Sequence, residues 1–228
     1  YFDFAGYCCM ALATARCFGY MLPRNFDYPY CPTSVTEFWR RWHISLSSWL
    51  RDYLYIPLGG NRGPWIRTYR NLFLTFIIGG LWHGASWNFV LWGALHGIGL
   101  CVHKAWSSVR PEFNLPGVGP ILGPAIALAL TQLWVLVGWV FFRAESLPDA
   151  MMILRAIGST FFEGPRDGTV FLILGVVAAD HVFRSSGRRA SLSDRFAENA
   201  VWVSLGAAAA LLIMLMPVAQ KSFIYFQF

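Results

Sequence analysis

Apolar residues occur in runs of helical length along the chain, and proline- and glycine-rich stretches separate these runs. The run 121–142 has the roughly 20 residues that a helix needs to cross a bilayer. Other apolar runs occupy 4–21, 71–82, 88–106, 168–183 and 199–218, while 146–157 is amphipathic and predicts a surface helix. The pattern predicts an all-α protein with several membrane-spanning helices, in which 71–82 is short for a span.

The segment 35–55 has helix-forming residues but is too polar for a lipid-facing span. Ser34, or Thr33 before it, suits an N-cap, and Glu37 follows Ser34 by three residues, as in a capping box. The rest of the segment holds Arg40, Arg41, His43, Arg51 and Asp52. We therefore predict one helix over 35–55 that lies in the membrane interface or enters the protein as a re-entrant element, and that ends at the prolines and glycines of 57–64.

The composition agrees with a membrane protein. Hydrophobic residues make up 56% of the chain and charged residues 13%, whereas soluble domains carry about 25% charged residues. The eleven tryptophans are typical of the aromatic belts at the two membrane interfaces. The five cysteines form no CxxC pair and no zinc-ligand spacing, so we expect no metal site.

The net charge of +6 has two general explanations, nucleic-acid binding and membrane topology. No nucleic-acid motif is present, so we expect no nucleic-acid partner. Basic loops on the cytoplasmic side and contact with anionic lipid explain the charge instead. The densest basic loop contains Arg184, Arg188, Arg189 and Arg195, and we predict that it is cytoplasmic.

His83 is the first candidate for chemistry, because it lies between Trp82 and Gly84 at the end of an apolar run. A titratable group inside a membrane protein is costly, so its presence is a functional hypothesis. Burial keeps an imidazole neutral, and a neutral imidazole can take the proton of a hydroxyl that attacks an acyl carbonyl. A hydrogen-bonded structural histidine explains the sequence equally well.

His43 is the second candidate, and Ser47 lies four residues on, which places both on one face of the predicted helix. With Arg40 and Arg41 close by, this group suits the orientation of a substrate or the stabilisation of an oxyanion. A histidine at the level of the lipid head groups is the alternative. His96 in GALHG is a secondary candidate, as is Ser47.

Arg40, Arg41 and Arg51 form the third candidate group. The guanidinium fork suits the phosphates of a coenzyme A donor, so these arginines are candidate donor-binding residues. Membrane topology and contact with lipid head groups explain them equally well.

Two long motifs resemble a known family. They are FWRRWHISLSSWLRDYLYIPLGGNR, from Phe38, and YRNLFLTFIIGGLWHGASWNFVLWGALHG, from Tyr69. Together they resemble the membrane-bound O-acyltransferase (MBOAT) superfamily, and within it the subgroup of the bacterial alginate O-acetyltransferase membrane subunit. The segments DFAGYCCMALATARCFGYMLPRNFDYPY and FIYFQF resemble the same subgroup, whereas about 111–216 shares only hydropathy with it.

The resemblance implies a polytopic helical membrane protein with short, re-entrant or interfacial helices around a central tunnel. The chain begins at Tyr1, and the resemblance makes 1–228 the C-terminal part of one such domain. Within it, 1–32 is the end of a span and a proline-rich loop, 33–106 holds the catalytic core helices, and 107–228 holds the C-terminal spans. The family's hallmark histidine falls on His83, and its second, more variable polar position falls on His43.

The resemblance also implies a reaction and a location. An acetyl group passes from a cytosolic donor, acetyl-CoA, across the bacterial inner membrane. It reaches an exopolysaccharide such as alginate, or a partner acetyltransferase outside the cytoplasm. Acetyl-CoA is then a substrate, and no bound cofactor is expected. Two other functions remain open: a membrane scaffold without catalytic activity, and a subunit for polysaccharide export.

Overall fold

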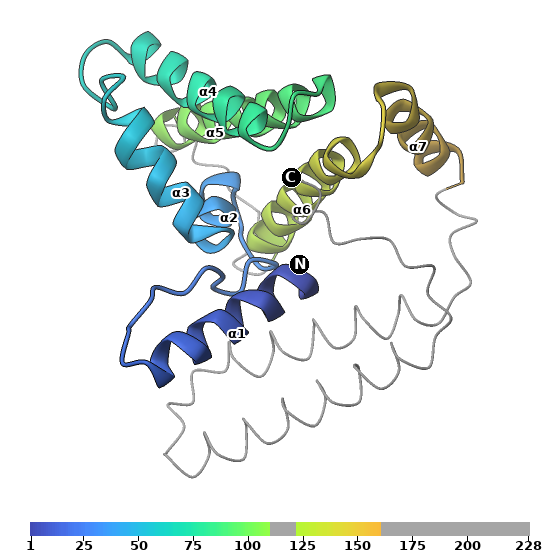
Figure 1. Ribbon diagram of the computed structural model, residues 1–228. Coiled ribbons are helices and arrows are strands. Elements are labelled where there is room, and N and C mark those ends of the chain that lie inside the picture. The colour runs from blue at the N-terminus through green and yellow to red at the C-terminus, as the bar shows by residue number, and fades with distance from the viewer. Residues whose placement is uncertain (110–121, 161–228) are drawn as a thin grey trace. The chain divides into compact units, whose positions relative to one another are not determined.

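The computed structural model describes residues 1–109 and 122–160. Within these residues every regular element is a helix and no strand occurs, which confirms the predicted all-α class for this part of the chain (Figure 1). The predicted spans 168–183 and 199–218 lie outside the described residues. The basic loop around Arg184 to Arg195 also lies outside them.

Five helices fall close to the apolar and amphipathic runs. They are α1 (Phe2–Cys17), α4 (Trp65–Trp82), α5 (Trp87–Val109), α6 (Leu122–Arg143) and α7 (Leu147–Thr160). α4 begins six residues earlier than the apolar run 71–82, because the polar turn that follows Pro64 is helical too. Among the described residues one helix, α6, is long and apolar enough to cross a membrane, and only 17% of its most apolar window is buried.

The predicted single helix over 35–55 is wrong, because the chain breaks at Trp42 and His43. The segment forms α2 (Val35–Arg41), α3 (Ile44–Leu50) and a π-helical turn η1 (Arg51–Tyr55). Trp42 is extended, and His43 has a left-handed backbone with φ of 44°. The break follows from pairing with a distant loop, since the Asp27 amide donates to the Arg41 carbonyl and the Ile44 amide donates to the Asn25 carbonyl, both at 2.9 Å.

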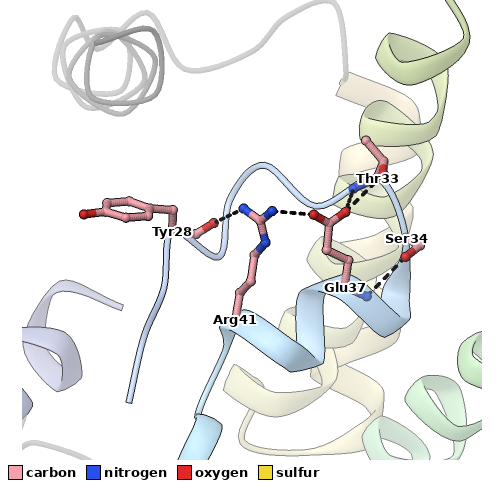
Figure 2. Close-up of polar contacts among 5 residues, drawn as sticks. All are labelled: Tyr28, Thr33, Ser34, Glu37 and Arg41. Atoms are coloured by element: carbon pink, nitrogen blue, oxygen red, sulfur yellow. Dashed lines mark hydrogen bonds and ion pairs between the residues drawn. The ribbon is translucent and has the colours of Figure 1, made fainter. Parts of the chain in front are cut away.

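The start of α2 is capped as the sequence predicts, with one difference. The Glu37 amide donates to the Ser34 hydroxyl at 3.1 Å, so Ser34 is the N-cap. The Glu37 carboxylate accepts from the Thr33 amide and hydroxyl, one residue before the position that a capping box uses. Arg41 lies between the Glu37 carboxylate and the Tyr28 carbonyl, so it ties α2 to the preceding loop (Figure 2).

Helices α4 and α5 form the most extensive helix pair and run side by side (Figure 1). Glycines allow their backbones to touch: a β-carbon on Gly80 would lie 2.2 Å from the Phe89 carbonyl oxygen, and one on Gly93 would lie 2.2 Å from the Phe76 carbonyl oxygen. Gly97, four residues after Gly93, also faces α4, so the pair has the small-residue spacing that brings membrane helices together.

The buried hydrophobic core lies where α2 packs against α4, α5 and α6. Aromatic residues dominate it, and indole and phenyl rings also supply most of the partly buried residues around it. The core residues are Val35, Phe38, Trp39, Phe76, Trp92, Leu100 and Val135. The helical hairpin of α4 and α5 therefore gives α2 its packing surface, and through α2 it fixes the segment that carries His43.

The glycine contact predicts that Gly93→Ala destabilises the protein. The new β-carbon meets backbone rather than a flexible side chain, so the helices must separate. We expect a loss of about 1–3 kcal/mol in the free energy of unfolding, measured as a lower melting temperature in detergent. Gly158→Ala in α7 is the control, because nothing lies within 4 Å of its β-carbon position and alanine favours a helix. Equal melting temperatures for Gly93→Ala and the wild type would contradict the close contact.

Candidate active site

Three of the histidines are buried in the described part of the chain. The exposed fractions are 9% for His43, 7% for His83 and 1% for His96. They come from three different elements: the break between α2 and α3, the end of α4, and the middle of α5. Two of the three, His83 and His96, contact the same ring, since the centroid of Trp92 lies 5.0 Å from that of His83 and 5.1 Å from that of His96.

His83 follows the last residue of α4, and Gly84 turns the chain after it with φ of 150°. Four aromatic rings surround the imidazole, with centroids at 4.8 Å (Trp82), 5.0 Å (Trp92), 5.0 Å (Phe142) and 6.1 Å (Phe89). No side chain among the described residues forms a hydrogen bond with the His83 ring. Burial, and secondarily the nearby His43, lower the pKa of His83 below its ordinary value, so the imidazole is neutral at pH 7.

His43 is held by polar contacts on one side of its ring and by an aromatic ring on the other. Its Nδ1 lies 3.3 Å from the Asn25 side-chain oxygen and 3.4 Å from the Ser45 hydroxyl. The ring of Phe4 in α1 packs edge-on against the imidazole, with centroids 4.9 Å apart. Burial lowers the pKa of His43 as well, so this imidazole is also neutral at pH 7.

The ring of His96 forms a hydrogen bond within the buried core. The Trp39 indole donates to Nδ1 of His96 at 3.2 Å, and an indole N–H can only donate. Nδ1 is therefore the nitrogen without hydrogen in the neutral ring, and Nε2 carries the hydrogen. Nε2 faces α6 at Gly138, where a β-carbon would lie 2.9 Å from it. The lone pair of His96 is occupied by Trp39, an arrangement that favours a structural role.

A basic cavity lies beside these histidines. It has a volume of about 590 Å³, and its charged lining residues are Arg40, Arg51 and Lys104. The sequence candidates Arg40, Arg51 and Ser47 thus lie on one cavity. Arg41 is not among its lining residues, and its guanidinium is paired with Glu37.

The cavity and the histidines are separate but adjacent. Neither His43 nor His83 lines the cavity, whereas Trp39 and Phe76 do. The same two rings contact His96 on their other side, with centroids at 5.1 and 6.5 Å. His43 and Ser47 do not lie on one helical face as predicted, because His43 precedes the first turn of α3, whereas Ser47 lines the cavity and donates to the Trp42 carbonyl.

Comparison with known proteins shows the family to which this sequence belongs. The family model described as MBOAT, membrane-bound O-acyltransferase family, matches residues 1–141, which contain all three buried histidines. The chain belongs to the membrane-bound O-acyltransferase family. The predicted resemblance is thereby confirmed.

The relatives of this MBOAT chain include bacterial proteins that are named for the transfer of acetyl or D-alanyl groups. "Probable alginate O-acetylase AlgI" of Pseudomonas aeruginosa is 49% identical over 159 residues, which cover 70% of this chain and 29% of that protein. "Peptidoglycan O-acetyltransferase" of Helicobacter pylori is 47% identical over 157 residues, which cover 69% and 29%. "Teichoic acid D-alanyltransferase" of Streptococcus thermophilus is 37% identical over 125 residues, which cover 50% and 29%. The MBOAT chain thus spans somewhat less than a third of the length of these relatives.

Two residues at the site carry no signal in the sequence that points to them. Asn25 lies in a proline-rich loop 18 positions before His43, and only the fold brings the two together. Lys104 follows His103 on α5 and lines the cavity, where its ammonium donates to Asn61 at 3.3 Å. No cluster of three metal-ligating side chains occurs among residues 1–109 and 122–160.

The hydrogen bond between Trp39 and His96 yields a stability prediction for this MBOAT chain. Trp39→Phe keeps an aromatic ring but leaves the buried Nδ1 of His96 without its donor. We expect a loss of about 1–3 kcal/mol in the free energy of unfolding, the cost of an unsatisfied buried acceptor. Thermal unfolding in detergent measures it, with Trp106→Phe as the matched control at a 46% exposed site. The same melting temperature for both variants would show that the bond does not stabilise the core.

Proposed function

We propose that this chain is the catalytic C-terminal part of a membrane O-acyltransferase, and that His83 is the base that activates the acceptor hydroxyl. The observation that carries the proposal is the environment of His83, which is buried among four aromatic rings and has no side-chain partner among the described residues. Buried polar groups in proteins are normally hydrogen-bonded. A neutral imidazole whose ring nitrogens make no hydrogen bond to the described side chains is suited to accept a proton.

The proposed reaction needs only one base. The acceptor hydroxyl gives its proton to His83 as its oxygen bonds to the acyl carbonyl carbon. The bond between that carbon and the donor sulfur then breaks, and the imidazolium returns the proton to the leaving thiolate. Trp92 supplies a buried indole N–H that has no partner among the described residues and lies beside His83, where it suits the negative charge that develops on the carbonyl oxygen.

We assign the acyl donor to the basic cavity. Arg40 and Lys104 line a volume of about 590 Å³ together with Arg51, which also pairs with Asp52, and a phosphorylated thioester such as acetyl-CoA is an anion that such a site attracts. Trp39 and Phe76 separate the cavity from the histidines, so the acyl end of the donor would enter beside these rings. His43, the second buried and neutral imidazole, is proposed as the partner of that base.

The acceptor and the setting are proposed from the relatives. Relatives named for alginate, peptidoglycan and teichoic acid favour a polymer hydroxyl outside the cytoplasm, reached directly or through a partner acetyltransferase. The apolar helix α6, little of which is buried, favours contact with lipid, and membership of a membrane-bound family favours a multi-pass protein of the bacterial inner membrane. The tunnel that such transfer requires would need segments beyond the described residues.

A scaffold or an export subunit is the competing function. In a scaffold His83 has no chemical role, and in an export subunit the buried histidines would relay protons or line the path of the polysaccharide without acyl chemistry. In both cases substitution of His83 would leave the acetyl content of the polymer unchanged as long as the partner acetyltransferase still binds.

The base role predicts that His83→Gln abolishes acetyl transfer. Glutamine keeps polar atoms at the site but cannot act as a base at neutral pH, so we expect at least a hundredfold loss, within the range for general base catalysis. The O-acetyl content of the secreted polysaccharide is compared in cells with full-length wild type or variant at equal membrane levels. Wild-type acetyl content with His83→Gln would reject the acyltransferase proposal in favour of the scaffold or export function.

The donor site predicts a separate effect on substrate affinity. Arg40→Glu places a carboxylate in the cavity that is proposed to bind phosphates, so KM for acetyl-CoA should rise at least tenfold while kcat changes less. Arg155→Glu is the control, since it makes the same charge change at an exposed position of α7 outside the cavity. If both variants leave KM unchanged, the cavity does not bind the donor.

A further inference from the structure

Asn25 lies in a loop but forms several hydrogen bonds with the start of α3. Its backbone carbonyl accepts from the Ile44 amide at 2.9 Å, and its side-chain oxygen accepts from the Ser45 amide at 3.1 Å and the Ser45 hydroxyl at 3.0 Å. His43, the N-cap residue of α3, makes no side-chain capping bond. Asn25 therefore caps α3 from a distant part of the chain.

These contacts fix which way the Asn25 amide points. A backbone N–H can only donate, so the atom of Asn25 that faces the Ser45 amide must be the oxygen. The amide nitrogen then points to α1, where it donates to the Cys8 sulfur at 3.3 Å. The orientation is thus determined by partners on both sides of the amide.

The orientation of Asn25 in turn fixes the tautomer of His43. The Asn25 oxygen lies 3.3 Å from Nδ1 and has no hydrogen to give. The Ser45 hydroxyl, 3.4 Å from Nδ1, already donates to the same oxygen, so it too can only accept from the ring. Both neighbours of Nδ1 are acceptors, which places the hydrogen on Nδ1 and the lone pair on Nε2.

We propose that Asn25 is a positioning residue for acyl transfer: it holds His43 with hydrogen on Nδ1 and leaves Nε2 unprotonated for the reaction. The proposal rests on the role proposed above for His43 as partner of His83. An amide that contacts the ring of a reacting histidine and sets its tautomer also fixes the orientation of that ring. Asn25 would thus connect the fold of the proline-rich loop to the chemistry.

The titratable groups around His43 come from more than one element. In α1 the Cys8 thiol accepts from Asn25, and the end of α4 carries the buried His83. Of the charged groups close in sequence to Asn25 and His43, Asp27 pairs with Arg24 and Arg41 pairs with Glu37, whereas Arg40 lines the basic cavity. A charge introduced at position 25 would instead contact the His43 ring directly, where the Asn25 oxygen lies 3.3 Å from Nδ1.

Asn25→Asp tests the proposal without loss of the cap. A carboxylate still accepts from Ser45 and from Nδ1, but its charge favours the protonated imidazole, so the midpoint of His43 titration should rise by roughly 1–3 pH units. In the full-length protein, deuterium exchange at the histidine C2 position, followed by peptide mass spectrometry, measures that midpoint independently of activity. Asp27→Asn is the control, a charge change at a residue of the same loop whose carboxylate pairs with Arg24, and it should leave the midpoint in place.

Activity supplies the second readout, with acetyl-CoA as donor and an alginate oligosaccharide as acceptor. The acid limb of kcat/KM for Asn25→Asp should move to higher pH by the same amount as the titration midpoint of His43, because the protonated imidazole has no lone pair on Nε2 for the reaction. An unmoved titration midpoint for His43 overturns the positioning role. A moved midpoint with an unmoved acid limb shows that His43 is held by Asn25 but does not take part in transfer. Failure of the acyltransferase proposal would be recognised separately, because His83→Gln would then keep wild-type activity.

Discussion

The rest of the described structure depends on the contact between the backbones of α4 and α5. Where Gly80 and Gly93 lie, hydrogen atoms stand in place of side chains, and carbonyl groups of the opposite helix fill the space. This close approach brings the end of α4 next to the first turns of α5, so that His83 meets Trp92 and, one turn further, Trp92 meets His96. A wider separation of the two helices would move each histidine away from the ring that encloses it.

Desolvation is the second constraint, and it acts on all three histidines together. His83 and His96 are enclosed mainly by aromatic rings, and His43 lies between polar side chains and the ring of Phe4; in each case burial disfavours a charge, so the neutral imidazole is the stable form. The consequences differ because the hydrogen bonds differ. His96 gives its lone pair to Trp39, His43 is fixed through Nδ1, and His83 makes no side-chain bond within the described residues. Equal burial thus leaves three chemically different histidines.

Much of the fold was predictable from hydropathy, because helix length and apolarity are local properties. The runs 88–106 and 121–142 became α5 and α6 with shifts of a few residues at their ends. His83 was also predictable, since a histidine between tryptophan and glycine in an apolar run is visible in the sequence alone. The helix over 35–55 failed at Trp42, because its break depends on hydrogen bonds to Asn25 and Asp27, which no local pattern reveals. Arg41 likewise could not be separated from Arg40 by sequence, since its pairing with Glu37 and Tyr28 follows from the helical turn and the loop together.

Helix α6 has one face that packs against the core and one face that is exposed. Thr131, Val135 and Gly138 are its buried residues, and they follow one another at intervals of four and three. Leu130, Leu133 and Leu136 point away from the core and are more than half exposed. The two faces of α6 are therefore under different constraints in sequence. The buried positions must keep side chains of the same size, including Gly138, which has no side chain and packs against His96. The outer positions need only remain apolar. Related chains should diverge along α6 mainly on one side.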